Sequence, residues 1–255
     1  MTRMDATANR FIEVKIKRQD GPKQPSYWQS FRIPWTPQHN VLSVLMEIRR
    51  NPVTADGKRV AAPVWDCSCL EEVCGACTMV VNGRVRQGCT ALVDQLEQPI
   101  TLEPMTKFPV VRDLIVDRNR MFEALKRVKA WIPIDGTYDL GPGPRMSNDL
   151  AEERYAISRC MTCGCCLEVC PQVKLDNDFI GAAAMGQIVY MNSHPTGALN
   201  RDERLDAAMD DGGVADCGNA QNCVRACPKE IPLTKAIAEV GRQTTLKSIR
   251  DFFRR

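Results

Sequence analysis

The chain has 255 residues, enough for one or two domains and for a hydrophobic core that needs no disulfide staples. Its net charge of only +3, with 44% hydrophobic and 25% charged residues, argues against a nucleic-acid-binding, disordered or membrane-spanning chain. The unusual count is cysteine, with 13 residues against only two histidines.

The first third is predicted as strands with one helix. Alternation of apolar and polar residues predicts strands over residues 11–18, 27–33, 79–81, 84–86 and 100–102. Turn residues join the first two strands, and Asn82-Gly83 joins the next two into a hairpin. Apolar residues at helical spacing predict a helix over 41–48, with Asn40 as its N-cap.

Beyond about residue 113 the pattern is helical, and no strand is expected there. Helices are predicted near residues 121–128, 149–160, 178–192, 201–210 and 232–249. Asp149 is expected to cap the second, Pro232 lies in the first turn of the last, and the Pro- and Gly-rich segment 133–144 is a loop. We therefore predict an α+β chain, with a β-rich domain over residues 1–110 and a helical domain over 111–255.

The cysteines fall into three groups, within residues 67–89, 160–170 and 217–227. Disulfide frameworks are typical of secreted proteins with an even cysteine count. Here the count is odd, Cys165 and Cys166 are adjacent, and the N-terminus has no apolar signal region. The longest nearly apolar run, 179–191, is too short to cross a bilayer. We expect a soluble chain in a reducing compartment whose cysteines bind metal.

The first group has the spacing C-x4-C-x2-C, with a fourth cysteine just after the predicted Asn82-Gly83 hairpin. This is the plant-type [2Fe–2S] pattern, and its ligands would be Cys69, Cys74, Cys77 and Cys89. Gly75 would let the backbone approach the sulfurs. Four thiolates could instead hold structural zinc, and Cys67 lies outside the pattern.

The second group is a bacterial-ferredoxin run, Cys160-x2-Cys163-x2-Cys166-x3-Cys170-Pro171. The third group, Cys217 to Cys227, repeats this register but has Ala220 at the second ligand position. In two-cluster ferredoxins the fourth cysteine of each run binds the other cluster. A [4Fe–4S] cluster would therefore take Cys160, Cys163, Cys166 and Cys227. Only Cys170, Cys217 and Cys223 remain for the other cluster, which predicts [3Fe–4S] and leaves Cys165 spare.

This order of cluster motifs resembles the iron–sulfur subunits of succinate dehydrogenase and fumarate reductase, through WDCSCLEEVCGACTMVVNG, CMTCGCCLEVCP and CVRACPKEIPLTKAI. The resemblance implies a β-grasp ferredoxin domain followed by an α-helical ferredoxin domain. It also implies a flavoprotein partner with FAD, a membrane-anchor partner that could carry haem b, and electron transfer to a quinone. The chain would lie peripherally on the cytoplasmic face of a bacterial inner membrane, held by the anchor.

Family members that use ubiquinone carry a tryptophan after the first run and a histidine after the first cysteine of the second. Here those places hold Val173-Lys174-Leu175 and Gly218, so menaquinone is expected, with Pro171 and Lys229 as quinone-side candidates. The alternatives are a quinol:fumarate reductase subunit working in reverse, a subunit of another flavin dehydrogenase, a soluble multi-cluster carrier and a structural zinc module. His39 and His194 are interpreted as surface residues.

Overall fold

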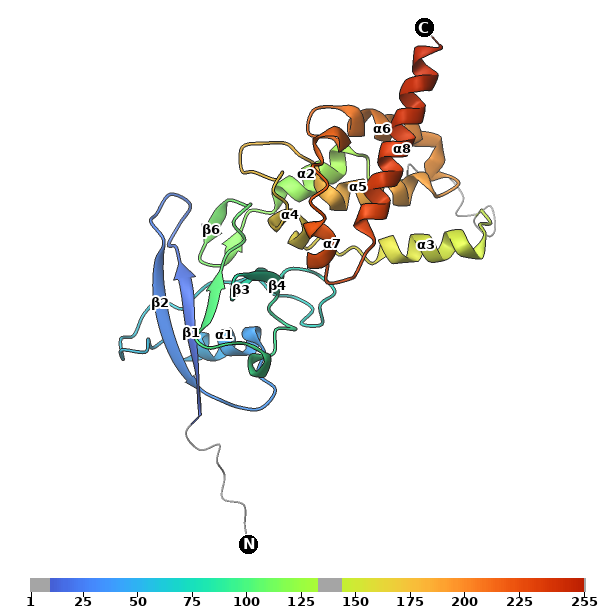
Figure 1. Cartoon of the computed structure of the whole chain (residues 1–255). Coiled ribbons are helices and arrows are strands. Elements are labelled where there is room, and N and C mark those ends of the chain that lie inside the picture. Colours follow the sequence, from blue (N-terminus) through green and yellow to red (C-terminus); the bar gives the residue numbers. More distant parts are fainter. Residues whose placement is uncertain (1–9, 133–143, 255) are drawn as a thin grey trace. The chain divides into compact units, whose positions relative to one another are not determined.

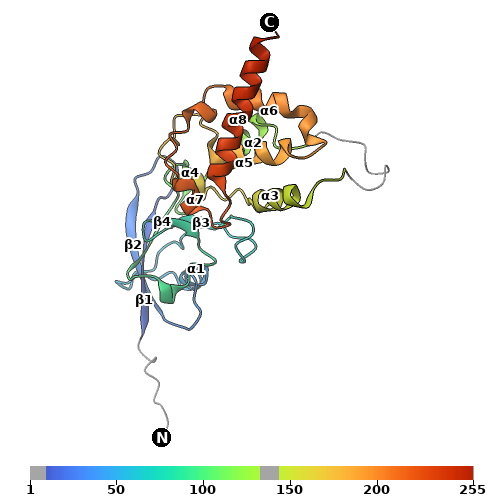
Figure 2. The same ribbon diagram turned by 45° about the vertical axis from the view of Figure 1, so that its right-hand side comes forward.

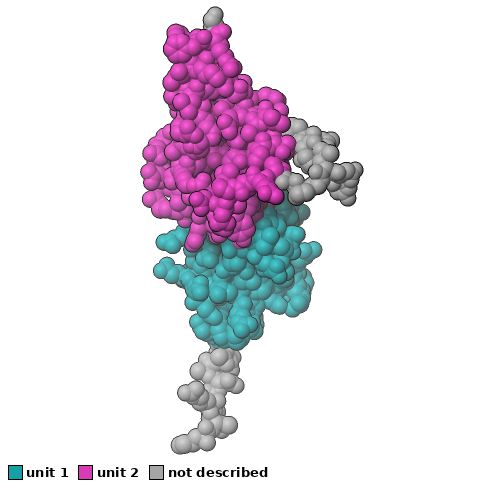
Figure 3. All heavy atoms as spheres, turned by 90° about the vertical axis from the view of Figure 1, so that its right-hand side faces the viewer, with its two compact units in different colours: residues 1–117 teal, residues 118–255 magenta. Residues whose placement is uncertain are grey.

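The computed structural model describes residues 10–132 and 144–254. They form two compact units, which Figure 3 shows in different colours. The first unit ends at Asp117 and the second begins at Arg118. The sequence placed the division after residue 110. Most of the predicted loop at 133–144 lies outside the described residues.

The first unit contains a five-stranded sheet with the strand order β2-β1-β5-β3-β4 (Figure 1). The strands are β1 (Phe11–Arg18), β2 (Tyr27–Pro34), β3 (Thr78–Val81), β4 (Arg84–Gln87) and β5 (Ile100–Glu103). β1 and β2 pair antiparallel, and so do β3 and β4, which confirms both predicted hairpins. β1 and β5 are parallel, as in the β-grasp fold that the resemblance implied.

Helix α1 (Val41–Arg50) supplies the other side of this core. Asn40 caps it as predicted, because its side chain accepts a 2.9 Å hydrogen bond from the Ser43 amide. The alternating residues of β1 and one stripe of α1 are buried together in one cluster, which includes Ile12, Val14, Ile16, Leu42, Leu45 and Ile48. The buried face of the strand and the buried face of the helix thus pack into a single hydrophobic core.

A two-stranded hairpin follows, of β6 (Val110–Arg112) and β7 (Ile115–Val116). The expectation of no strand beyond residue 113 was therefore wrong for β7. Strands this short contain too few residues for an alternating pattern to be recognised in the sequence. Their position depends on the buried carboxylate of Asp113, whose hydrogen-bond donors are distant in the sequence. Asp113 accepts from Arg18 Nε at 2.8 Å and from the amides of Gln19 and Val64 at 3.1 and 2.9 Å.

The second unit is helical. Its helices are α2 (Asn119–Arg127), α3 (Asn148–Ser158), α4 (Cys165–Glu168), α5 (Gly181–Asn192), α6 (Arg201–Met209), α7 (Asn222–Ala226) and α8 (Leu233–Phe252). All five predicted helices are present, and the short α4 and α7 are added within the cysteine runs. Within residues 10–132 and 144–254, 3₁₀ turns cover Val93–Gln95 in the first unit and Gly197–Asn200 and Val214–Asp216 in the second.

Helix α5 lies at the centre of this unit, beside α8 in both Figure 1 and Figure 2. Ala182, Ala184, Met185 and Ile188 are buried, so the apolar run at 179–191 forms a core helix. None of the helices in the described parts of the chain is both long and apolar enough to cross a membrane.

One predicted cap was wrong. Ser147, not Asp149, is the N-cap of α3, and its hydroxyl accepts from the amide of Leu150 at 3.3 Å. Asp149 lies in the first turn, where a carboxylate is stabilised by the helix dipole without capping an amide.

The buried Arg18–Asp113 pair yields a stability prediction. Replacement Asp113→Ala leaves the Arg18 guanidinium buried without its carboxylate, and we expect the first unit to lose about 3–5 kcal/mol of unfolding free energy. Urea unfolding followed by tryptophan fluorescence measures this, because Trp28, Trp35 and Trp65 lie in that unit.

The matched control is Glu47→Ala, which removes an exposed carboxylate paired with Arg50. We expect it to cost less than about 1 kcal/mol. Equal losses in the two variants would contradict a special role for the buried pair.

Candidate metal centres

Most of the first cysteine group lies in an irregular loop before β3, as predicted, and Cys89 lies in the turn after β4. The sulfur of Cys69 accepts hydrogen bonds from the backbone amides of Glu71, Val73 and Cys74 at 3.4, 3.3 and 3.3 Å. The amide of Ala76 donates to the sulfur of Cys74 at 3.4 Å. A loop that aims its N–H groups at two cysteine sulfurs is arranged to stabilise thiolates.

Positive φ angles make this inward turn of the amides possible. Leu70, Glu72 and Gly75 have φ of 62°, 56° and 68°. Two of these are non-glycine residues in a sparsely populated region, which is strain of the kind that clusters at functional sites. The predicted role of Gly75 in backbone approach agrees with its conformation.

The thiols of this group differ in acidity. Backbone hydrogen bonds from Glu71, Val73 and Cys74 lower the pKa of Cys69 to about 7. Burial raises the pKa of Cys77 to about 12, and the neighbouring Cys89 adds to the rise. The structure thus brings Cys69 beside Cys74 and Cys77 beside Cys89.

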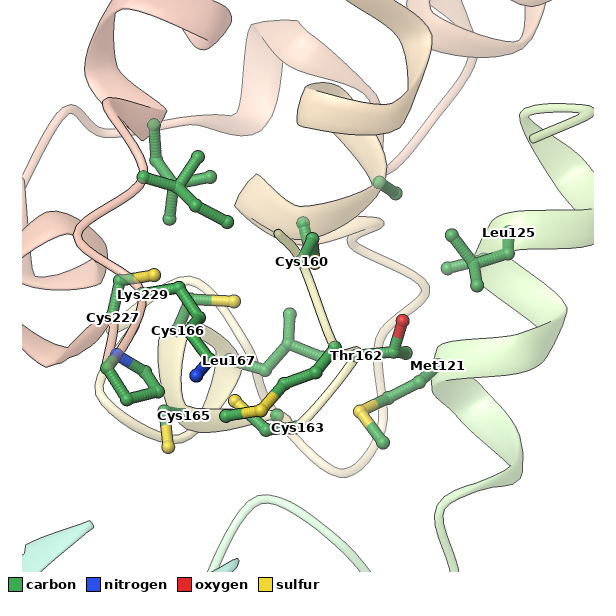
Figure 4. A pocket seen from close by; sticks show the side chains of 18 of the residues that line it. Met121, Leu125, Cys160, Thr162, Cys163, Cys165, Cys166, Leu167, Cys227 and Lys229 are labelled. Carbon is green, nitrogen blue, oxygen red and sulfur yellow. The ribbon is translucent and has the colours of Figure 1, made fainter. Parts of the chain in front are cut away.

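The second unit has two cavities bordered by cysteines. The first cavity is bordered by five of them, Cys160, Cys163, Cys165, Cys166 and Cys227 (Figure 4). Its remaining wall is mostly apolar, with Met121 and Leu125 from α2 labelled in Figure 4. Cys227 belongs to the other run, so this cavity joins residues from both runs as the cross-ligation hypothesis requires.

Burial is the main influence on these thiols. It raises the pKa of Cys160 and, far more strongly, that of Cys166, and the charges of the neighbouring cysteines act in the same direction. The pKa of Cys163 is instead lowered to about 7, first by a hydrogen bond from the Cys165 side chain and to a smaller extent by the charge of Arg118.

The second cavity is bordered by Cys170, Cys217 and Cys223, with Ala220 beside them. Burial raises the pKa of Cys223, and the charges of the other two cysteines add to it. Cys170 here comes from the first run, which completes the exchange between the runs. Cys170, Cys217 and Cys223 thus border one cavity, and the four cysteines predicted for the other cluster border the first cavity together with Cys165.

Close packing holds the two runs together. Asn222 of α7 donates to the backbone oxygen of Val169 at 3.1 Å, across the two runs. Gly181, with φ +75°, begins α5 against α4, and a Cβ there would lie 2.1 Å from Leu167 Cδ2. The positive φ favours glycine at this position.

The other predicted residues are distributed as follows. Pro171 borders the second cavity, whereas Lys229 borders the first (Figure 4). The spare Cys165 is buried beside the first cavity, and Cys67 is exposed. His39 and His194 are half-buried and make local hydrogen bonds, to Ser43 and to the amides of Thr196 and Gly197.

Sequence reasoning missed two neighbours of these cavities. Arg118 donates from Nη2 to the backbone oxygen of Cys163 at 3.0 Å, and Gln172 borders the second cavity. Arg118 is 45 residues from Cys163, and no spacing rule connects them. Gln172 adjoins the Cys-Pro pair, which could have drawn attention to it.

The residues present fit iron–sulfur clusters. Iron–sulfur clusters are held by cysteine thiolates and tuned by hydrogen bonds to sulfur, and both features are present here. Among the described residues, no three Cys, His, Asp or Glu side chains are close enough to hold a single metal ion.

Comparisons with known domains agree with this chemistry. Residues 13–123 match a 2Fe-2S iron-sulfur cluster binding domain, and residues 156–231 match a 4Fe-4S dicluster domain. The two matches cover the cysteine groups of the first and second units respectively.

Curated relatives resemble the chain along almost its whole length. It is 60% identical over 242 residues to the succinate dehydrogenase iron-sulfur subunit of Bacillus subtilis, covering 95% of this chain and 96% of that protein. It is 34% and 29% identical to the fumarate reductase iron-sulfur subunits of Mycobacterium tuberculosis and Wolinella succinogenes, covering 89% and 92% of this chain and 89% and 97% of the relatives.

Among solved structures, a chain of the Mycobacterium smegmatis Sdh1 complex in the apo form superposes with a TM-score of 0.77. The match covers 94% of this chain and 98% of that chain at 20% sequence identity, so it shows a shared fold.

The acidity of Cys69 can be tested on the cluster-free chain. Because three amides stabilise its thiolate, we expect half-maximal alkylation by iodoacetamide near pH 7, whereas buried Cys77 resists alkylation until far higher pH. Peptide mass mapping after short pulses at pH 5 to 9 measures both rates. Identical pH profiles for the two cysteines would refute the arrangement of amides described above.

Proposed function

The chain belongs to the family of succinate dehydrogenase and fumarate reductase iron-sulfur subunits, and we propose that it relays electrons from a flavoprotein subunit to a membrane quinone. It is an electron carrier of an oxidoreductase complex, with a [2Fe–2S] domain followed by a [4Fe–4S] dicluster domain. Succinate chemistry belongs to the flavoprotein partner, so this chain has no catalytic residue of its own.

The proposal depends on one observation above all, that Cys227 borders the same cavity as the cysteines of the first run and Cys170 the same cavity as those of the second. When bound, the clusters accept and release one electron at a time. We propose that Cys160, Cys163, Cys166 and Cys227 hold a [4Fe–4S] cluster and that Cys69, Cys74, Cys77 and Cys89 hold the [2Fe–2S] cluster. The common border of the first four with one cavity supports the first assignment, and the amides aimed at Cys69 and Cys74 support the second.

We further propose that Cys170, Cys217 and Cys223 hold a [3Fe–4S] cluster. Ala220 borders the same cavity at the register position of a fourth ligand, and its methyl group offers no sulfur. A position beside the cavity without a ligand favours a three-iron cluster there.

The quinone would lie near this second cavity, with Pro171 as a contact residue. Gly218 stands where ubiquinone-using members carry histidine. The side-chain amide of Gln172 lies against it, because a Cβ on Gly218 would be 2.5 Å from Gln172 Nε2. This difference supports menaquinone. Lys229 borders the first cavity, so we propose that it lines the [4Fe–4S] site rather than contacting the quinone.

The partners proposed are a flavoprotein that carries FAD and an integral membrane anchor that could carry haem b. Through the anchor the chain would lie on the cytoplasmic face of the membrane. Succinate oxidation is preferred to fumarate reduction because the 60% identical relative is a succinate dehydrogenase subunit, whereas the fumarate reductase relatives are at 34% and 29%.

Metal analysis and EPR of the purified complex test the proposal. We expect about nine irons per chain, counted as two, four and three, and an oxidised three-iron signal in the protein as isolated. Zinc without iron would refute it. Succinate:menaquinone and menaquinol:fumarate assays on the same complex decide the direction.

Restoring a thiolate at residue 220 tests the three-iron assignment. We expect Ala220→Cys to convert the cluster to [4Fe–4S], to abolish the oxidised three-iron EPR signal and to lower the cluster's reduction potential. Val224→Cys is the control, because residue 224 lies on α7 and does not border the second cavity. Retention of the three-iron signal in Ala220→Cys would contradict the proposed ligand set.

A further inference from the structure

Arg118, which belongs to neither cysteine run, contacts one of the cysteines that border the first cavity. Arg118 immediately precedes α2, and its guanidinium Nη2 donates to the backbone oxygen of Cys163 at 3.0 Å. An arginine side chain remains protonated at any physiological pH. The peptide oxygen of Cys163, a proposed ligand of the [4Fe–4S] cluster, therefore accepts a hydrogen bond from a permanently charged guanidinium.

The two cavities differ in charge. Lys229 also borders the first cavity, and its side chain runs among the cysteine side chains in Figure 4. No described residue that borders the second cavity is charged, and its polar lining consists of Gln172, Asn219, Gln221, Asn222 and Thr234. Positive charge therefore accompanies the four-thiolate set, and uncharged side chains surround the three-thiolate set.

We propose that Arg118 raises the reduction potential of the [4Fe–4S] cluster through its contact with Cys163. Arg118 is a positioning residue, since it acts through Cys163. The inference rests on the proposed ligand set. Reduction adds one electron to the cluster and breaks no bond, so a nearby positive charge stabilises the reduced, more negative state.

The environment of the contact makes this charge effective. Arg118 is half-buried, and Cys166 beside Cys163 is buried, so the guanidinium acts across protein rather than across bulk water.

The test is an EPR-monitored redox titration of the purified complex, with dithionite as reductant, for wild type and three variants. Arg118→Gln removes the charge and keeps a hydrogen-bond donor. Arg118→Lys keeps the charge. Lys126→Gln is the matched control, since it removes an exposed charge from α2, the helix that Arg118 precedes, where Lys126 pairs with Glu123.

We expect Arg118→Gln to reduce the equilibrium constant for reduction of the [4Fe–4S] cluster by threefold to tenfold, a fall of about 28 to 59 mV for a one-electron couple. The other two clusters and the Lys126→Gln variant should keep their wild-type potentials. Arg118→Lys should remain within a factor of two of wild type.

An unchanged [4Fe–4S] potential in Arg118→Gln overturns the inference. An equal fall of the potential in Arg118→Lys also overturns it. That variant keeps the positive charge, so the fall would come from altered geometry and not from loss of charge. Iron content and the EPR signals of all three clusters are measured on every variant. Absence of the [4Fe–4S] signal in the wild type would refute the proposed function itself, which separates the two failures.

Discussion

The exchange of cysteines between two sequence runs is the constraint on which the helical unit depends. Cys227 borders the first cavity and Cys170 the second, so α4 and α7 must lie against each other. The Asn222 bond to Val169 joins α7 to the end of α4, and the Gly181 contact packs α5 against α4. Helix α5, buried on several faces, then serves as the core around which the remaining helices pack.

Both units combine an acidic cysteine with cysteines whose burial opposes ionisation. In the first, the loop turns backbone amides towards Cys69, which lowers its pKa, whereas burial raises the pKa of Cys77. In the second, the pKa of Cys163 is lowered, whereas burial raises the pKa values of Cys160 and Cys166. Ionisation of the buried thiols must be driven by bound metal, so cluster binding is coupled to folding in both units.

What could be predicted from sequence was local. Alternation, the Asn82-Gly83 turn and the Asn40 cap act over a few residues, and cysteine spacing encodes how one loop surrounds a cluster. Ser147 and Asp149 compete for one cap within three residues, a choice that depends on backbone geometry. Arg118 and Asp113 act on partners far away in sequence, so their roles emerge only when the folded chain brings those partners together.

The two cavities differ in the charged side chains around them. Arg118 at Cys163 and Lys229 on the wall of the first cavity place positive charge near the four-thiolate set, whereas no Lys, Arg, Asp or Glu among the described residues borders the second cavity. Because a fourth thiolate at residue 220 is expected to lower the potential of the second cluster, the four-thiolate cluster should have the lower potential of the two. On this proposal the cations bring the potentials of neighbouring clusters closer together. A smaller step between them favours electron transfer in both directions, which accords with a family that contains both succinate dehydrogenases and fumarate reductases.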